Sequence, residues 1–149
     1  MSWRKFEFAS PELAALGAAR LTGRIAYLAT ISADGAPRVH PVSPLISQAT
    51  LFVYMEPTSP KGNDLCRDSR YAMHCSVEDT SGGGGEFCVR GRAVMVDDPQ
   101  TRDKAFDAAR SLGYKPKDRY TLFELDVEEA LATTYEDGMP VRRRWKADN

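Results

Sequence analysis

The sequence predicts a mainly β protein: a small antiparallel barrel of six or seven strands with short flanking helices. Three observations support this fold class: an early hairpin signal, a run of short β-rich segments separated by turn residues, and helices that do not alternate with strands. Consecutive antiparallel strands of this length tend to close into a barrel, because closure removes exposed sheet edges. A doubly wound parallel sheet would need a helix in each crossover, so it is not expected.

Length and composition indicate one globular domain spanning residues 1–149. The net charge of −1 gives no reason to expect nucleic acid or an anionic membrane as a partner. The three cysteines (Cys66, Cys75 and Cys88) are odd in number, unlike a secreted disulfide framework. The N-terminal residues are too charged for a signal peptide, and no apolar run is long enough to span a bilayer. We therefore expect a cytoplasmic protein.

Turn and capping residues divide the chain into elements. Ser10 and Pro11 are typical of a helix start and Gly23 of its end, and Asp97, Asp98 and Pro99 are expected to cap a later helix. The Asp34-Gly35 pair is a strong hairpin signal. We expect the first three strands to form an antiparallel meander. The expected helices cover residues 11–22, 60–68 and 99–112, and the expected strands cover residues 24–31, 37–45, 50–55, 71–77, 86–96, 120–127 and 130–135, with the basic segment 141–146 closing the chain.

The segment TSPKGNDL, residues 58–65, carries the most chemical information. It places two hydroxyls, a lysine and a glycine at a helix start, where free N–H groups and the helix dipole favour an anion. The ammonium of Lys61 would suit a phosphate. An ordinary capped helix with a solvated lysine explains the same residues, and the segment alone leaves both interpretations open.

Other chemistry receives less support from the sequence. Prolines within the segment 37–43 belong at a sheet edge, a bulge or a ligand, and His40 could face solvent, core or ligand. His74 and Cys75 are adjacent in a strand and point to opposite faces, so no metal site is expected. The glycine run 82–85 lacks the ending of a phosphate loop, and no nucleophile elbow occurs. The basic tail 142–146 is more typical of a solvated edge strand than of a nucleic-acid site.

Residues 21–96 resemble the pyridoxamine 5′-phosphate oxidase-like split barrels. The resemblance rests on the order GRIAYLATISADGAPRVHPV, then an aromatic strand, then SPKGNDLCRDSR. It implies a split β-barrel and a flavin- or deazaflavin-dependent oxidoreductase. It also implies a homodimer with the cofactor in a groove between the subunits.

The resemblance also implies roles for individual residues. Lys61, with Thr58 and Ser59, would hold the cofactor phosphate, and Asn63 would assist. A partner's Trp145, with an arginine of the tail, would approach the ring. The ribityl chain and the ring would be lined by Arg38, Val39, His40, Pro41 and Val42.

The implied activity is that of an FMN-dependent oxidoreductase acting on an unknown small substrate. The alternatives are the 8-hydroxy-5-deazaflavin coenzyme in place of FMN, or a module that binds flavin, haem or a tetrapyrrole without turnover. The chain lacks the C-terminal Arg-Leu substrate motif of true pyridoxamine phosphate oxidases, so pyridoxamine phosphate is not the expected substrate. No catalytic side chain is assigned, although His40 or Tyr27 could transfer a proton.

Overall fold

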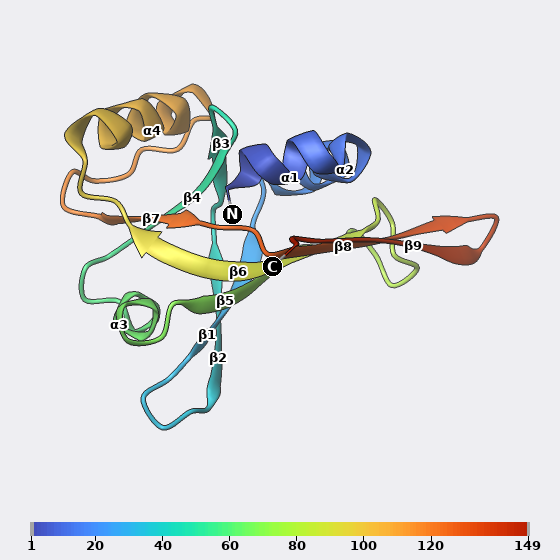
Figure 1. Cartoon of the computed structure of the whole chain (residues 1–149), viewed down its shortest axis with the longest axis horizontal. Helices are drawn as coiled ribbons and strands as arrows, with labels where there is room; N and C mark the ends of the chain where they lie inside the picture. Colours follow the sequence, from blue (N-terminus) through green and yellow to red (C-terminus); the bar gives the residue numbers. More distant parts are fainter. Residues whose placement is uncertain (1, 149) are drawn as a thin grey trace.

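The computed structural model describes residues 2–148, which form a curled antiparallel sheet with short helices around it (Figure 1). The predicted fold class is therefore confirmed, although the described residues form nine strands and the sequence predicted six or seven. The elements in chain order are α1 Trp3–Ala9, α2 Pro11–Leu21, β1 Ala26–Ile31, β2 Pro37–Val42, β3 Leu45–Ser47, β4 Thr50–Met55, α3 Pro60–Arg67, β5 Arg70–Cys75, β6 Glu86–Met95, α4 Pro99–Ser111, β7 Thr121–Leu125, β8 Glu129–Glu136 and β9 Met139–Lys146.

Strand β6 joins the two parts of the sheet. The strand order is β2-β1-β5-β6-β7-β4-β3, and β8 pairs with both β6 and β9. One edge of β6 pairs with β5, while its other edge pairs first with β8 and then with β7. The β8–β9 ribbon consequently projects away from the barrel, at the right of Figure 1.

The expected three-stranded meander is wrong at its second pairing. The Asp34-Gly35 turn does join β1 and β2, with Gly35 at φ +85°, a conformation that favours glycine. The expected strand 37–45, however, is interrupted at Ser43 and Pro44, and β3 rather than β2 pairs with β4. Pro44 has no N–H to donate to a ladder, so the chain leaves one part of the sheet there and enters the other.

Helix α1 was not predicted. The expected start of α2 is confirmed, with Ser10 as the N-cap residue and Pro11 at the first helical position, although the Ser10 side chain makes no cap hydrogen bond. Burial of Trp3 and Phe6, three residues apart on one helix face, stabilises α1. The α4 start is as expected, since Asp98 accepts a hydrogen bond from the N–H of Thr101. No helix within residues 2–148 is long and apolar enough to cross a membrane.

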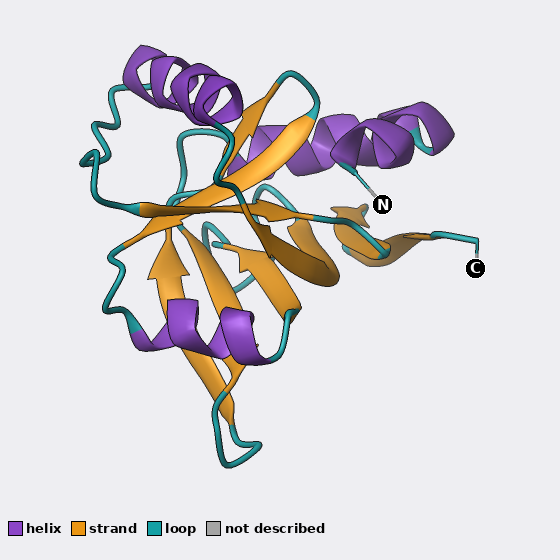
Figure 2. Ribbon diagram, turned by 60° about the vertical axis from the view of Figure 1, so that its left-hand side comes forward, coloured by secondary structure: helices purple, strands orange, loops and turns teal. Residues whose placement is uncertain are grey.

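Alternation along β4 divides the core in two. Leu51, Val53 and Met55 face the interior of the curled sheet, whereas Phe52 and Tyr54 face the cluster beneath α4. Helix α3 lies at the opposite end of the sheet from α4, α1 and α2 (Figure 2). The end of β4 therefore sits between α4 and the start of α3.

Candidate functional site

The start of α3 presents a half-buried ammonium. Lys61 Nζ donates to Ser59 Oγ at 3.0 Å, and no carboxylate within residues 2–148 forms an ion pair with it. Burial lowers the pKa of Lys61, and an anionic ligand would oppose that shift by favouring the charged form. The Ser59 side chain makes no cap bond to α3, so it is free to accept from the lysine.

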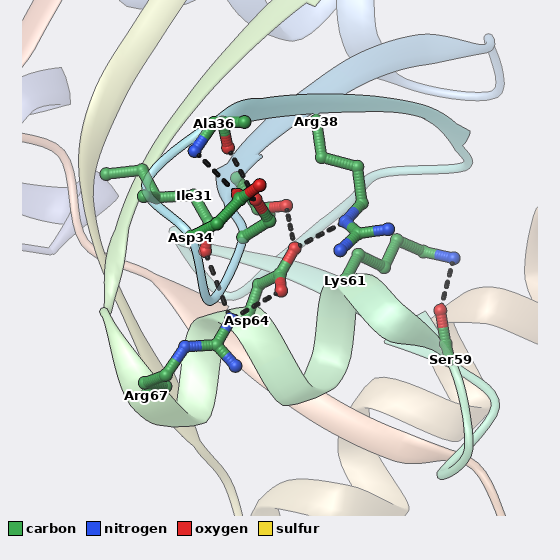
Figure 3. Close-up of polar contacts among 10 residues, drawn as sticks. Ile31, Asp34, Ala36, Arg38, Ser59, Lys61, Asp64 and Arg67 are labelled. Carbon is green, nitrogen blue, oxygen red and sulfur yellow. Dashed lines mark hydrogen bonds and ion pairs between the residues drawn. The ribbon is translucent and has the colours of Figure 1, made fainter.

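A buried carboxylate fixes α3 against the first hairpin (Figure 3). Asp64 accepts hydrogen bonds from Thr30 Oγ1 at 2.8 Å, Arg38 Nε at 2.8 Å and Arg67 Nη2 at 2.7 Å. Only 3% of its side chain is exposed. Burial alone would raise the pKa of Asp64, but the bonds from Thr30 and Arg38, together with the positive charges of Arg38 and Arg67, outweigh burial and lower it. This network ties β1, β2 and α3 together and holds Lys61 in place one helical turn away.

A cavity of about 340 Å³ opens beside Lys61. Its walls come from the residue before β1, the ends of β2 and β4, the start of α3 and the loop after α4. The lining residues are Ile25, Pro41, Val42, Ser43, Tyr54, Met55, Glu56, Lys61, Tyr114 and Tyr120. Glu56 forms an ion pair with Arg119, which offsets its negative charge.

Tyr54 contributes a buried donor to this cavity. The residue is 8% exposed, and its hydroxyl has no hydrogen-bond partner within the described chain. Burial raises the pKa of the phenol, so the hydroxyl keeps its proton. An unpaired buried hydroxyl is costly, and a ligand oxygen that accepted its hydrogen bond would remove that cost.

The predicted site residues of β2 lie on both faces of the strand. Arg38, His40 and Val42 lie opposite Thr30, Leu28 and Ala26, on the face toward the sheet interior, whereas Val39 and Pro41 lie on the outer face. Pro41 and Val42 line the cavity with Lys61, and Arg38 is engaged by Asp64.

His40 has a buried Nε2 with no partner in the described chain. Burial, and then the nearby charges of Lys61 and Arg38, lower its pKa and favour the neutral ring.

Seven of the ten predicted residues are not among those that line the cavity: Arg38, Val39, His40, Thr58, Ser59, Asn63 and Trp145. Thr58 and Asn63 are exposed next to Lys61. Trp145 lies on β9 and packs against Phe6 of its own chain, with ring centroids 5.0 Å apart. The prediction for Trp145 concerns a second subunit and stays a prediction.

Sequence reasoning missed Asp64, Thr30 and Tyr54 as members of the site. Asp64 had one available signal, since it lies three residues before Arg67 on α3 and can form an intrahelical pair. Thr30 and Tyr54 lie within β-rich runs where a hydroxyl-bearing residue is unremarkable in sequence.

The curled antiparallel sheet, with a cavity beside Lys61 at a helix start, places the protein in the class of split β-barrels. The sequence model for pyridoxamine 5′-phosphate oxidase matches residues 15–134, and the chain belongs to that family. Comparison with curated proteins gives no match.

Solved structures share the fold at low sequence identity. PhzG from Burkholderia lata, in complex with tetrahydrophenazine-1-carboxylic acid, has a TM-score of 0.65 and 16% identity over 97% of this chain and 87% of its own. A heme binding protein from Mycobacterium smegmatis gives 0.67 and 18% over 89% of this chain, but only 56% of its own. The heme storage protein HutZ from Vibrio cholerae gives 0.60 and 19%, over 80% and 89% of the two chains. These likenesses show the fold alone.

Proposed function

We propose that the protein binds FMN at the cavity beside Lys61 and acts as a flavin-dependent oxidoreductase on a small molecule. Two donors carry this proposal. Among residues 2–148, the Lys61 ammonium donates only to the neutral Ser59 hydroxyl, and the buried Tyr54 hydroxyl has no partner. Both groups are donors, and a phosphorylated polyol offers acceptor oxygens. The bound flavin supplies the redox chemistry, whereas the chain supplies binding and orientation.

The residues at the start of α3 have distinct binding roles in this proposal. Lys61 and Ser59 hold the phosphate, and the exposed side chains of Thr58 and Asn63 are close enough along the chain to assist. The Asp64 carboxylate does not oppose the anion, because Arg38 and Arg67 compensate its charge. Strand β2 is an edge strand, so backbone groups along residues 38–42 remain available to a flavin ring.

Titration of cofactor-stripped protein with FMN, followed by flavin fluorescence, tests this function. We expect Lys61→Ala to weaken FMN binding by about 1–3 kcal/mol, the scale of a charge-assisted hydrogen bond. Lys5→Ala, at an exposed lysine of α1, is the matched control. Riboflavin lacks the phosphate and should bind both variants alike. Unchanged FMN affinity in Lys61→Ala would remove the lysine from the site, and the deazaflavin coenzyme is titrated in parallel as the alternative cofactor.

We further propose that two copies of the chain associate through the outer face of the sheet, in a reducing cytoplasm where its free cysteines persist. Tyr27, Val39 and Leu131 are exposed there by 47%, 62% and 40%. Cross-strand pairing places Tyr27 and Leu131 in one row with His74 and Cys88 between them, a row without charge. Light scattering on Tyr27→Glu should show a shift from dimer to monomer. A monomeric wild type would contradict this assembly and, with it, the role of a partner's Trp145.

Haem binding without turnover is the second candidate function, and His74 favours it. Its Nδ1 lies 2.6 Å from the carbonyl oxygen of Cys75. Because a carbonyl only accepts, Nδ1 carries the proton, and Nε2 keeps the lone pair that an axial ligand needs. Haem titration with and without His74→Ala distinguishes this function, since loss of a Soret shift in the variant would support it.

A further inference from the structure

A second cavity, of about 220 Å³, adjoins the one proposed for the cofactor. The two cavities share Ile25, Ser43 and Tyr114 among their lining residues. The additional walls come from the start of β1, the β2–β3 connection and the C-terminal end of α4. A molecule in the second cavity would therefore lie directly beside a molecule in the first.

The lining of the second cavity is mostly apolar. Leu45 and Ala109 are buried in its wall, whereas Ile25 and Leu112 are 47% and 45% exposed. Arg24 is the one charged side chain among the lining residues, and Glu78 lies 3.6 Å from it. The cavity thus offers mainly apolar contact area, and its one cation, Arg24, has a counter-charge. The adjoining cavity differs because it is lined by Lys61.

The end of α4 makes this cavity unfavourable for an anion. The helix ends at Ser111, and Leu112, Gly113 and Tyr114 follow it in the cavity wall. The C-terminal end of a helix carries partial negative charge on its last carbonyls, which repels anions. A phosphate or carboxylate group would also lose hydration without gaining a cation.

We propose that the second cavity binds the organic substrate, and that this substrate is a neutral, largely apolar compound of one or two rings. This inference rests on the proposed function, because it requires the flavin in the adjoining cavity. The volume of the cavity, its apolar lining and the helix C-terminus together select against phosphorylated or carboxylated substrates.

Calorimetric titration with 2-naphthol and 2-naphthoate, which share a ring system and differ in charge at neutral pH, tests the proposal. Both are titrated into the full chain with and without saturating FMN. We expect saturable binding of 2-naphthol, and at least tenfold weaker binding of 2-naphthoate. Leu112→Asp should weaken 2-naphthol binding at least tenfold and leave FMN affinity within twofold. Lys61→Ala should weaken FMN binding at least tenfold and leave 2-naphthol affinity within twofold.

Equal affinity for the two naphthalenes, failure of 2-naphthol to bind, or no effect of Leu112→Asp would each overturn the proposal. If Leu112→Asp does not fold, Leu112→Asn adds polarity without charge at the same half-exposed position and should weaken 2-naphthol binding in the same direction. Binding of 2-naphthol without any binding of FMN would refute the flavin function while leaving an apolar ligand site. Binding of FMN without binding of 2-naphthol would refute the apolar ligand site and leave the flavin function standing.

Discussion

Helices α1 and α3 pack against the same curled sheet, α1 through aromatic rings and α3 through a buried carboxylate. At the α1 end, Phe6 lies 5.0 Å from both Trp3 and Trp145 and 6.5 Å from Phe87, measured between ring centroids. At the α3 end, Asp64 accepts three hydrogen bonds from side chains on β1, β2 and α3 itself.

The two kinds of contact have different roles: the aromatic packing at α1 stabilises the fold, and the hydrogen bonds at α3 fix the position of the site. Apolar packing is non-directional and does not depend on protonation, so it suits the part of the molecule that needs only to stay folded. Charge-assisted hydrogen bonds have fixed geometry, and they are used where Lys61 must be held next to a cavity. The following variants perturb one end at a time.

The largest effect is expected at the aromatic end. Phe87→Ala removes a fully buried ring that contacts Trp3 and Phe6, and should lower the free energy of unfolding by about 3–5 kcal/mol in urea titrations. Phe8→Ala is the control, because Phe8 is 91% exposed and should change stability little. Comparable losses for the two variants would contradict the packing described for α1.

At Asp64 we expect a smaller loss of stability than at Phe87 but a larger effect on FMN binding. Asp64→Ala leaves Arg38 and Arg67 without their carboxylate, and because both are partly exposed the cost should be about 1–3 kcal/mol. FMN affinity should fall as well, since Lys61 is on the same helix. Asp103→Ala, at an exposed carboxylate of α4, serves as control. If folded Asp64→Ala bound FMN with full affinity, the Asp64 hydrogen-bond network would not be needed for the FMN site.

Acid should affect the two ends differently. The pKa of Asp64 is lowered from its ordinary 3.8, so its stabilisation is present above that value and is lost as the pH falls through the folded-state pKa. The stability difference between wild type and Asp64→Asn should therefore shrink in urea titrations below about pH 4. The difference between wild type and Phe87→Ala should stay constant over the same range. A pH-independent Asp64→Asn difference would argue against an ionised carboxylate.

The smallest effect is expected from Arg67→Met. Arg67 is 43% exposed, and an exposed partner typically contributes less than about 1 kcal/mol. Arg38 and Thr30 would still hold Asp64. A loss as large as that of Asp64→Ala would show that Arg67, rather than the hairpin contacts, anchors α3.

Local signals in the sequence were sufficient for most elements. The Asp34-Gly35 turn and the Asp98 cap act within a few residues, and both are found where expected. The family resemblance identified the fold and pointed to Lys61. By contrast, the split of the second strand depends on which distant strands pair with each half, and neighbouring residues carry little of that information.

Only part of the site could be predicted from the sequence. Asp64 bonds to residues 26 and 34 positions away, and the cavity beside Lys61 has walls from five separate segments. Helix α1 was missed because it has no side-chain cap bond, and because Trp3 and Phe6 are buried against Phe87 and Trp145, which lie far along the chain. Each of these features is produced by tertiary contacts, which local propensity does not encode.

The break at Ser43 and Pro44 has a consequence for the substitutions that the cavity wall can accept. Residues 41–43 form part of the cavity wall at the seam where the chain leaves β2 for β3, and within residues 2–148 the outer edge of β2 pairs with no strand. A ligand at this seam meets main-chain groups, which every amino acid except proline provides in full. Side chains along the seam can therefore be substituted with little effect on such main-chain contacts, while the barrel itself persists.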